Sequence, residues 1–286
     1  MQDADPTIVQ TKLDTQTTEN ASSSASTAQA PQKIILPVIS PRHNPEVLLF
    51  NVEDIRTLRN DHHILGLLSG TLPQFPQQNI FLSIPLKLNI YETLWLVKMD
   101  VARLVDQLSY RLAKLQSCTQ TNQVEPGENM VTIPNMDPTG YDHGIARTHE
   151  IPTRAYIESY LSNASRRDRR NFKRHFRYYA FLQDRGFYIN PGLKFGGDLV
   201  LYPGDPLRYH SYSIVRFEFV DMYEIISGGR LATSVKKNMI VMGSRDANTR
   251  EQGGAEDDVT VDDEYVSSLF EDEVPLCFSI EWSGFG

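Results

Sequence analysis

The sequence LKFGGDLVLYPGDPLRYHS, residues 193–211, decides how the second half of this chain is expected to fold. The apolar residues that lead up to Tyr202 are typical of a buried β-strand. The run Pro203–Pro206 follows, and its two prolines, glycine and aspartate end a strand in a turn. β-Branched and aromatic residues then predict a second strand over 210–219. Tyr202 and His210 are therefore expected at the two ends of one turn.

The residues around this turn predict one α/β unit over 151–286. Helices are expected over about 153–161 and 165–184, the second after a capping residue at Asn163 or Ser165. Strands at 187–189, 197–202 and 210–219, a helix over 220–229, and strands at 238–242 and 275–282 follow. This order gives a central mixed sheet with one crossover helix.

The first half is expected to hold a smaller α+β domain over 33–118. Its predicted elements are strands 34–39 and 47–50, helices 52–60 and 90–98 that begin after Asn51 and Asn89, strand 101–105 and helix 106–117. Residues 1–32 are rich in Gln, Thr, Ser and Ala and are predicted to be a disordered tail. Residues 119–150, rich in Pro and Gly, are interpreted as a linker or long loop.

The net charge of the 286-residue chain is −8, which taken whole argues against a nucleic-acid binder. The acidic excess is local, however. Residues 251–273 hold ten acidic residues and no lysine or arginine, and the first thirty residues contribute −3, so the remainder carries +5. We interpret 245–273 as an acidic, solvated and mobile insertion before the last strand. The body of the chain is therefore mildly basic.

Membrane-spanning and disulfide-rich classes are not indicated. No run approaches the roughly 18–20 apolar residues that a membrane helix needs, and the polar N-terminus has no apolar signal core. Cys118 and Cys277 lie far apart, which argues against a disulfide scaffold or a cysteine zinc site. Both are interpreted as free thiols in a reducing compartment.

Three side chains that can carry protons are predicted to meet at one edge of the second sheet. Tyr202 ends a strand, His210 begins the next, and Lys237 begins another after a short helix. A phenol, an imidazole and an ammonium group suit RNA cleavage without a metal. One group takes the proton of a ribose 2′-hydroxyl, one protonates the departing 5′-oxygen, and a cation stabilises the transition state.

The sequences GLKFGGDLVLYPGDPLRYH, residues 192–210, and GRLATSVKK, residues 229–237, resemble the catalytic domain of the tRNA-splicing endonuclease family. The resemblance is strongest to the smaller catalytic subunit of the eukaryotic four-subunit enzyme, to which the 3′ splice site is assigned. It covers about 151–243 well, and 34–105 weakly. It implies a nuclease-like catalytic domain with the tRNA-intron endonuclease fold. It further implies cleavage of intron-containing precursor tRNA without a cofactor or metal, leaving 2′,3′-cyclic phosphate and 5′-hydroxyl ends.

The resemblance assigns Tyr202 as general base, His210 as general acid and Lys237 as the cation. Because a free phenol has a pKa of about 10, Tyr202 either has a lowered pKa or only orients the 2′-hydroxyl. Lys236 is the competing choice for the lysine. Strand alternation is expected to point Lys236 and Lys237 to opposite faces, so that only one reaches the site.

Four further residues are assigned to RNA binding. The family clamps a bulged base between an arginine and a tryptophan or second arginine, and Arg230 and Trp282 match these positions. This pair is expected to serve the neighbouring catalytic subunit's site, at the 5′ splice site. Alternatively, Trp282 packs in the core and Arg230 lies at a helix C-terminus. Arg170 and Arg174 belong to the helix 165–177, whose seven positive charges suit tRNA phosphates, a solvated surface or an acidic partner segment.

Three other functions compete with this interpretation. A metal-dependent nuclease would use paired carboxylates, for which Asp198, Asp205 and Glu218 are the available side chains. A non-catalytic architectural subunit or a general RNA-binding module would not need Tyr202, His210 and Lys237 together.

Partners are implied by the resemblance. They are precursor tRNA, the second catalytic subunit and two structural subunits, one of which is expected to pair with the terminal strand 275–282. The family expectation for location is the nucleus, with the cytosolic face of the mitochondrial outer membrane as the alternative and no membrane insertion.

Overall fold

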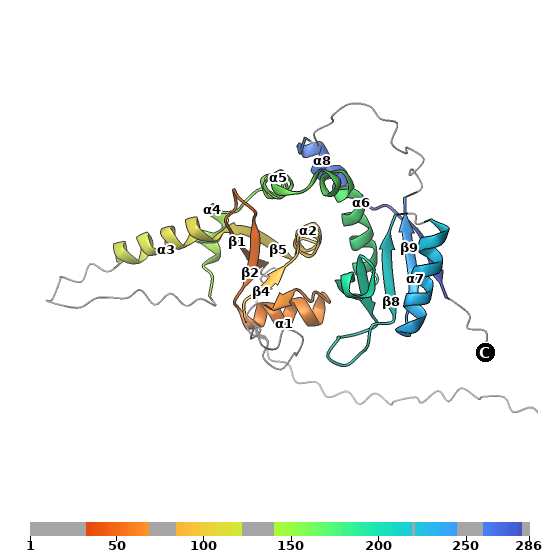
Figure 1. Ribbon diagram of the computed structural model, residues 1–286. Coiled ribbons are helices and arrows are strands. Elements are labelled where there is room, and N and C mark those ends of the chain that lie inside the picture. The colour runs from red at the N-terminus through yellow and green to blue at the C-terminus, as the bar shows by residue number, and fades with distance from the viewer. Residues whose placement is uncertain (1–32, 69–83, 122–139, 219–220, 245–259, 282–286) are drawn as a thin grey trace, which may run out of the picture. The chain divides into compact units, whose positions relative to one another are not determined.

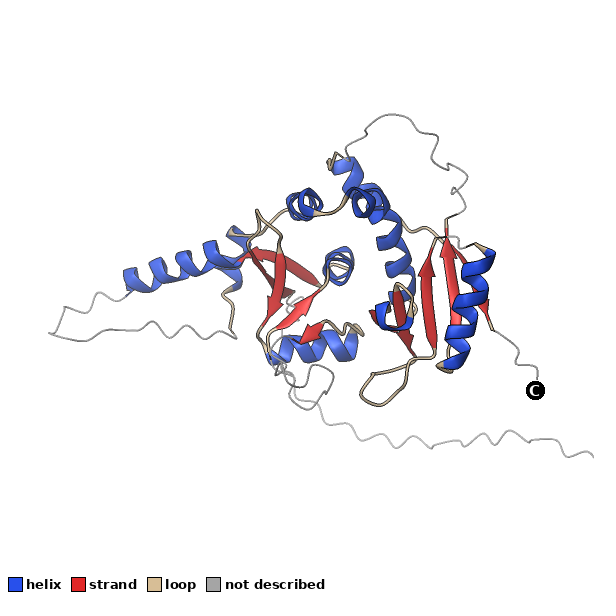
Figure 2. Cartoon of the chain, in the orientation of Figure 1, coloured by secondary structure: helices blue, strands red, loops and turns tan. Residues whose placement is uncertain are grey.

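A computed structural model of the protein describes residues 33–68, 84–121, 140–218, 221–244 and 260–281 (Figure 1). The tail at 1–32, predicted to be disordered, lies outside the described residues. These residues form two mixed five-stranded sheets with helices against them (Figure 2), which confirms the predicted α/β class. Residues from Lys33 onward make up one compact unit.

The first sheet has the strand order β3-β4-β2-β1-β5, and only β1 and β5 run parallel. Its strands are β1 (Ile34–Ile39), β2 (Glu46–Leu49), β3 (Leu67–Leu68), β4 (Leu86–Leu88) and β5 (Ala102–Asp106). The predicted hairpin of β1 and β2 is confirmed. Its helices are α1 (Val52–Asp61), α2 (Ile90–Lys98) and α3 (Gln107–Thr121). The side chains of Asn51 and Asn89 cap α1 and α2 as expected, since each accepts a backbone N–H of the first turn.

The second sheet has the order β10-β9-β8-β7-β6, and only β8 and β9 run parallel. Its strands are β6 (Tyr188–Pro191), β7 (Leu199–Tyr202), β8 (Ser213–Phe217), β9 (Asn238–Gly243) and β10 (Leu276–Ile280). The predicted crossover helix is α7 (Met222–Ser234), which connects the parallel pair. The helices before the sheet are α5 (Thr153–Asn163) and α6 (Arg166–Gln183), and Ser165 caps α6.

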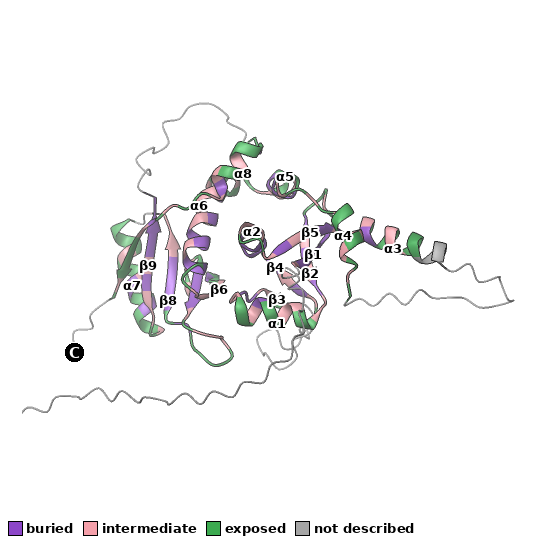
Figure 3. Cartoon of the chain, turned by 180° about the vertical axis from the view of Figure 1, so that it is seen from behind, coloured by how far each residue is buried: buried purple, intermediate pink, exposed green. Residues whose placement is uncertain are grey.

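Helices lie on both faces of this sheet (Figure 3), and apolar side chains of its strands pack in buried clusters with them. Val215 of β8 belongs to one buried cluster with Phe172 and Phe176 of α6. Its neighbour Ile214 belongs to another, with Ala232 of α7. Adjacent residues of a strand point to opposite faces, so α6 and α7 cover different sides. The ends of the strands, where they join loops, remain available for a site.

Two segments differ from the sequence-based expectation. Within the predicted linker 119–150, α4 (His143–Thr148) forms and buries Ala146 against Tyr110 of α3. Within the acidic insertion, α8 (Asp263–Leu269) forms, and Leu269 is fully buried in the main core. Few apolar residues suffice to anchor a polar segment when their positions match a helix, which composition alone does not reveal. Residues 122–139 and 245–259 lie outside the described part of the chain.

No helix among the described residues is both long and apolar enough to cross a membrane.

Candidate active site

One row of paired residues runs across three strands of the second sheet. Leu201 of β7 pairs with Ser213 of β8, and Ser213 pairs with Asn238 of β9. Since β7 is antiparallel to β8 and β8 is parallel to β9, the end of β7 and the starts of β8 and β9 lie at the same edge. Tyr202, the loop holding His210, and Lys237 all border this row. We call this edge, with Tyr202, His210 and Lys237, the candidate edge.

Tyr202 is the last residue of β7 and is half-buried. It pairs directly with Tyr188 of β6, so the two phenol side chains lie on the same face of the sheet. The ring of His63 lies against Tyr188, with 4.6 Å between the ring centroids. Tyr202 therefore occupies a defined position at the sheet's edge, beside a second aromatic side chain that is itself packed.

His210 lies in the loop between β7 and β8 and is exposed. The strand expected over 210–219 is shorter in the structure, because β8 begins only at Ser213 and ends at Phe217. Asp205 shortens the ladder: its backbone carbonyl accepts the N–H groups of Arg208 and Tyr209, at 2.8 and 3.0 Å. These bonds form a turn that extends through the residue before His210. An exposed imidazole at this place can exchange protons with a bound substrate.

Lys237 is connected directly to the residue that follows His210. Its Nζ donates a 2.7 Å hydrogen bond to the carbonyl oxygen of Ser211 and lies 4.9 Å from the centre of the Phe195 ring. Partial burial lowers the pKa of the Lys237 ammonium group from its ordinary value. A lysine held this way places its charge at the candidate edge.

Lys236 does not follow the predicted strand alternation, because β9 begins only at Asn238. Lys236 has a left-handed backbone, with φ 55°, and is exposed. The backbone N–H groups of both lysines bond back to the end of α7, to Thr233 and Ala232. The turn that ends this helix, rather than a strand, therefore separates the directions of the two side chains.

The three carboxylates of the metal-nuclease alternative do not come together. Asp198 precedes β7 and Asp205 follows it, so they lie at opposite ends of one strand. Glu218 follows β8 at the end near Asp198, and pairs with Arg174 at 3.2 Å. Asp198 accepts the backbone N–H of Phe217, and Asp205 accepts both Nε and Nη2 of Arg59. Asp205 therefore cannot share an ion with the other two, and Asp198 and Glu218 are already bonded to the Phe217 N–H and to Arg174.

Arg59 is a residue that the motif did not indicate. It lies on α1 of the first sheet's unit and bonds to Asp205, at 2.7 and 2.8 Å. The signal available in the sequence is the aspartate of the Pro203–Pro206 turn, for which Arg208 is the nearer candidate partner. Nothing in the sequence around Arg59 distinguishes it from Arg56 on the same helix.

Arg230 lies within α7 and is exposed, because the helix continues to Ser234 rather than ending at Gly229. The alternative that Arg230 sits at a helix C-terminus is therefore wrong. Trp282 follows β10 in the sequence and lies outside the described residues. That Trp282 and Arg230 clamp a base together therefore stays a prediction.

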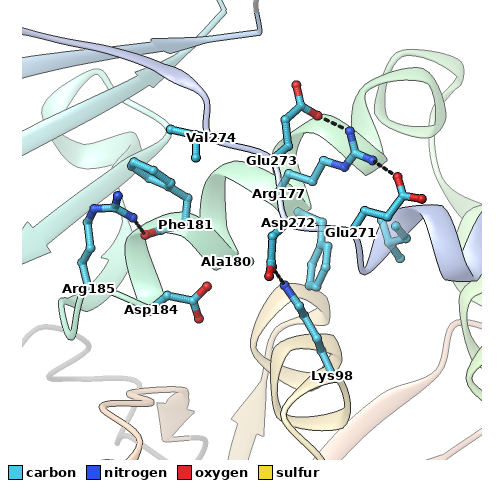
Figure 4. Close-up of a pocket in the computed structure, with 12 residues that line it drawn as sticks. Lys98, Arg177, Ala180, Phe181, Asp184, Arg185, Glu271, Asp272, Glu273 and Val274 are labelled. Carbon is cyan, nitrogen blue, oxygen red and sulfur yellow. Dashed lines mark hydrogen bonds and ion pairs between the residues drawn. The ribbon is translucent and has the colours of Figure 1, made fainter.

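Some of the basic side chains of helix α6 contact the acidic segment that contains α8. Arg177 bonds to Glu271 and Glu273, and Lys173 bonds to Ser268 of α8. Figure 4 shows Arg177 between the two glutamates. Arg177 also lines a cavity of about 170 Å³. Arg174 bonds to Glu218 and Asn171, whereas Arg170 is exposed. Of the two predicted RNA-binding residues of this helix, Arg170 is the more accessible.

Comparisons with known proteins bear on both halves of the chain. Residues 38–107 match the family described as TSEN34-like, N-terminal domain, and residues 172–250 match the tRNA intron endonuclease, catalytic C-terminal domain. The chain is 31% identical to the probable tRNA-splicing endonuclease subunit sen34 of Schizosaccharomyces pombe, over 84% of this chain and 95% of that protein. It is 29% identical to the tRNA-splicing endonuclease subunit SEN34 of Saccharomyces cerevisiae, over 84% and 99%. It is 39% identical to human Sen34 over 22% of each chain.

Proposed function

Because this chain belongs to the Sen34 family of tRNA-splicing endonuclease subunits and carries the family's catalytic domain, we propose that it cleaves intron-containing precursor tRNA at the 3′ splice site. The single observation that carries the proposal is the candidate edge. There the register of β7, β8 and β9 aligns the end of one strand with the starts of two others. Tyr202, His210 and Lys237, the proposed base, acid and cation, border this one row.

In the proposed reaction, the ribose 2′-oxygen attacks the neighbouring phosphorus and the bond from phosphorus to the 5′-oxygen breaks. Tyr202 accepts or orients the 2′-hydroxyl proton, and His210 gives a proton to the departing 5′-oxygen. Lys237 stabilises the additional negative charge on the phosphate oxygens. The products are a 2′,3′-cyclic phosphate and a 5′-hydroxyl, and the step needs no metal or other cofactor.

Replacing Tyr202 with phenylalanine tests this assignment with little change in packing, since only the hydroxyl is removed. We expect cleavage at the 3′ splice site to slow by about a hundredfold. The measurement is single-turnover cleavage of labelled precursor tRNA by the purified complex in excess chelator, with the ends of the products identified.

Tyr212→Phe is the matched control, because Tyr212 is an exposed tyrosine just before β8. Cleavage at the 5′ splice site in the same reaction reports on assembly. Unchanged 3′ cleavage by the Tyr202 variant would assign this chain an architectural or general RNA-binding role. A requirement for a divalent metal would favour the metal-dependent alternative.

For RNA binding, we propose that Arg230 and Trp282 hold a base at the neighbouring catalytic subunit's site, and that Arg170 and Arg174 contact tRNA phosphates. The exposed position of Arg230 on α7 supports the first part. Stacking of a base on an arginine or aromatic side chain contributes about 1–3 kcal/mol.

Replacing Arg230 with alanine is therefore expected to slow 5′ cleavage by about tenfold and to change 3′ cleavage much less. Separate quantification of the two cuts in one reaction measures this difference. Arg42→Ala removes the same charge from the exposed turn between β1 and β2 and serves as the control. An equal loss at both sites would contradict the division of labour.

The proposed partners are the second catalytic subunit and two structural subunits, with precursor tRNA as substrate. Among the described strands, β10 lies at an outer edge of its sheet and pairs with β9 on one side. Phe278 of β10 is 53% exposed. An edge strand with an exposed aromatic side chain suits pairing with a structural subunit by strand addition. On family grounds we place the assembly in the nucleus, with the cytosolic face of the mitochondrial outer membrane as the alternative.

A further inference from the structure

The loop between β7 and β8 is fixed by a residue far away in the sequence. Arg59 of α1 donates from Nε and Nη2 to the two carboxylate oxygens of Asp205, at 2.7 and 2.8 Å. A planar guanidinium that meets a carboxylate with two parallel bonds defines its orientation as well as its distance. The two side chains are only 23% and 24% exposed, against 66% and 76% for the neighbouring pair Arg56–Glu53.

Asp205 is the residue around which this loop is built. Its Oδ1 accepts the backbone N–H of Leu207, and its backbone carbonyl accepts those of Arg208 and Tyr209. The Tyr209 ring lies so close to Gly204 that a Cβ there would meet it at 2.6 Å. His210 comes directly after this compact turn. The position of its backbone therefore depends on where Asp205 is held.

The residues that follow α1 also contact the strand that lies beside Tyr202. His63, two residues beyond the helix, packs its ring on Tyr188 at 4.6 Å. Tyr188 pairs with Tyr202 across β6 and β7. Arg59 also raises the acidity of Asp205: hydrogen bonding to Arg59 is the main reason that the pKa of this carboxyl lies below its ordinary value. The aspartate is thus held in its charged form beside the arginine.

We propose that Arg59 is a positioning residue for cleavage by this chain: through Asp205 it holds the loop that places His210 at the candidate edge. The inference rests on the proposed function, because it assumes that His210 acts on the substrate. Among the described residues, no hydrogen bond or ion pair joins Arg59 to the three assigned catalytic side chains, and the assignment gives it no contact with RNA. Its effect is geometric, and a displacement of about 1 Å at a reacting group can slow a reaction by about a hundredfold.

The test is a double-mutant cycle in the complete four-subunit complex with precursor tRNA, using Arg59→Ala, Asp205→Asn and both together. Asparagine keeps the oxygen that accepts the Leu207 N–H but loses the charge. We expect each single change to lower kcat at the 3′ splice site by about tenfold to a hundredfold, with KM changed by less than about twofold. The double change should be no worse than the worse single change, because both remove one interaction.

Arg56→Ala is the matched control, because Arg56 has the same charge on the same helix and, within the described part of the chain, pairs with the exposed Glu53 rather than with Asp205. It should leave both cleavages unchanged. Arg59→Lys should lose less kcat than Arg59→Ala, because lysine keeps the charge but cannot make the bidentate contact. Cleavage at the 5′ splice site by the same complexes should stay at the wild-type rate.

Each other outcome overturns the proposal. Equal loss at both splice sites, or loss of assembly, would make Arg59 merely structural. A raised KM with unchanged kcat would make it an RNA contact. Additive effects in the double variant would separate Arg59 from Asp205. His210→Ala, measured in parallel, separates this failure from failure of the proposed function: if that variant cleaves normally, the catalytic assignment fails, whatever Arg59 does.

Discussion

Replacing His210 with alanine in the assembled complex is expected to slow 3′ splice-site cleavage by about 10³-fold or more, while cleavage at the 5′ site continues. Without a proton, the 5′-oxygen would depart as an alkoxide, which is a poor leaving group. It therefore needs a proton in the transition state. His210 is exposed in a loop whose backbone is held by Asp205, so loss of its ring should not disturb the fold. Single-turnover assays that resolve the two cuts measure the effect.

Two further measurements sharpen this expectation. Added imidazole should restore part of the rate of the His210 variant, because the side chain is accessible to solvent. His43→Ala, which removes an exposed histidine from the turn between β1 and β2, should leave both cuts unchanged. Full 3′ cleavage without His210 would remove the basis for the proposed mechanism.

Replacing Lys237 with alanine is expected to slow 3′ cleavage by about 10²–10³-fold, the usual effect of losing one group that stabilises transition-state charge. Two effects combine here. The ammonium group is lost from the candidate edge, and Ser211, next to His210, loses the hydrogen bond that Lys237 donates to its carbonyl. Rate measurements with saturating complex isolate the chemical step from binding.

A pH profile of 3′ cleavage tests whether the charge on Lys237 is the feature that matters. Burial lowers the pKa of Lys237, so the cation, and with it the activity, should be lost as pH rises through a value below that of an ordinary lysine. Lys237→Arg keeps its charge at high pH. Because His210 must also be protonated to act as the acid, the contribution of Lys237 is measured as the difference between the pH profiles of the wild type and of this variant. Lys236→Ala is the control, and a larger loss from it than from Lys237→Ala would reverse the assignment.

Much of this arrangement follows from short-range patterns. Asn51, Asn89 and Ser165 mark helix starts correctly because a side chain that accepts the first free N–H groups acts within one turn. The turn after Tyr202 was also predicted, since proline and glycine restrict the backbone locally. Strand starts depend on more than the local pattern. His210 was placed in a strand because its neighbours favour strands, whereas Asp205 keeps the backbone in a turn.

Long-range contacts could not be predicted from this one sequence. Arg59 and Asp205 are 146 residues apart, and no local pattern pairs a surface arginine with a loop aspartate. The helix α8 was missed because its acidic composition outweighed the few apolar residues that it buries. The two lysines 236 and 237 were separated for the wrong reason, since their directions depend on how α7 ends.

The position of the acidic segment has a consequence for how this protein tolerates change. β9 begins at the candidate edge and ends at Gly243, which pairs with Leu276 where β10 begins. The long connection therefore leaves and returns at neighbouring points on the sheet's far side. Doubling the length of such a closed loop costs only about 0.6 kcal/mol. An insertion into this connection would therefore enter at the end of the sheet opposite Tyr202, His210 and Lys237, the proposed catalytic residues.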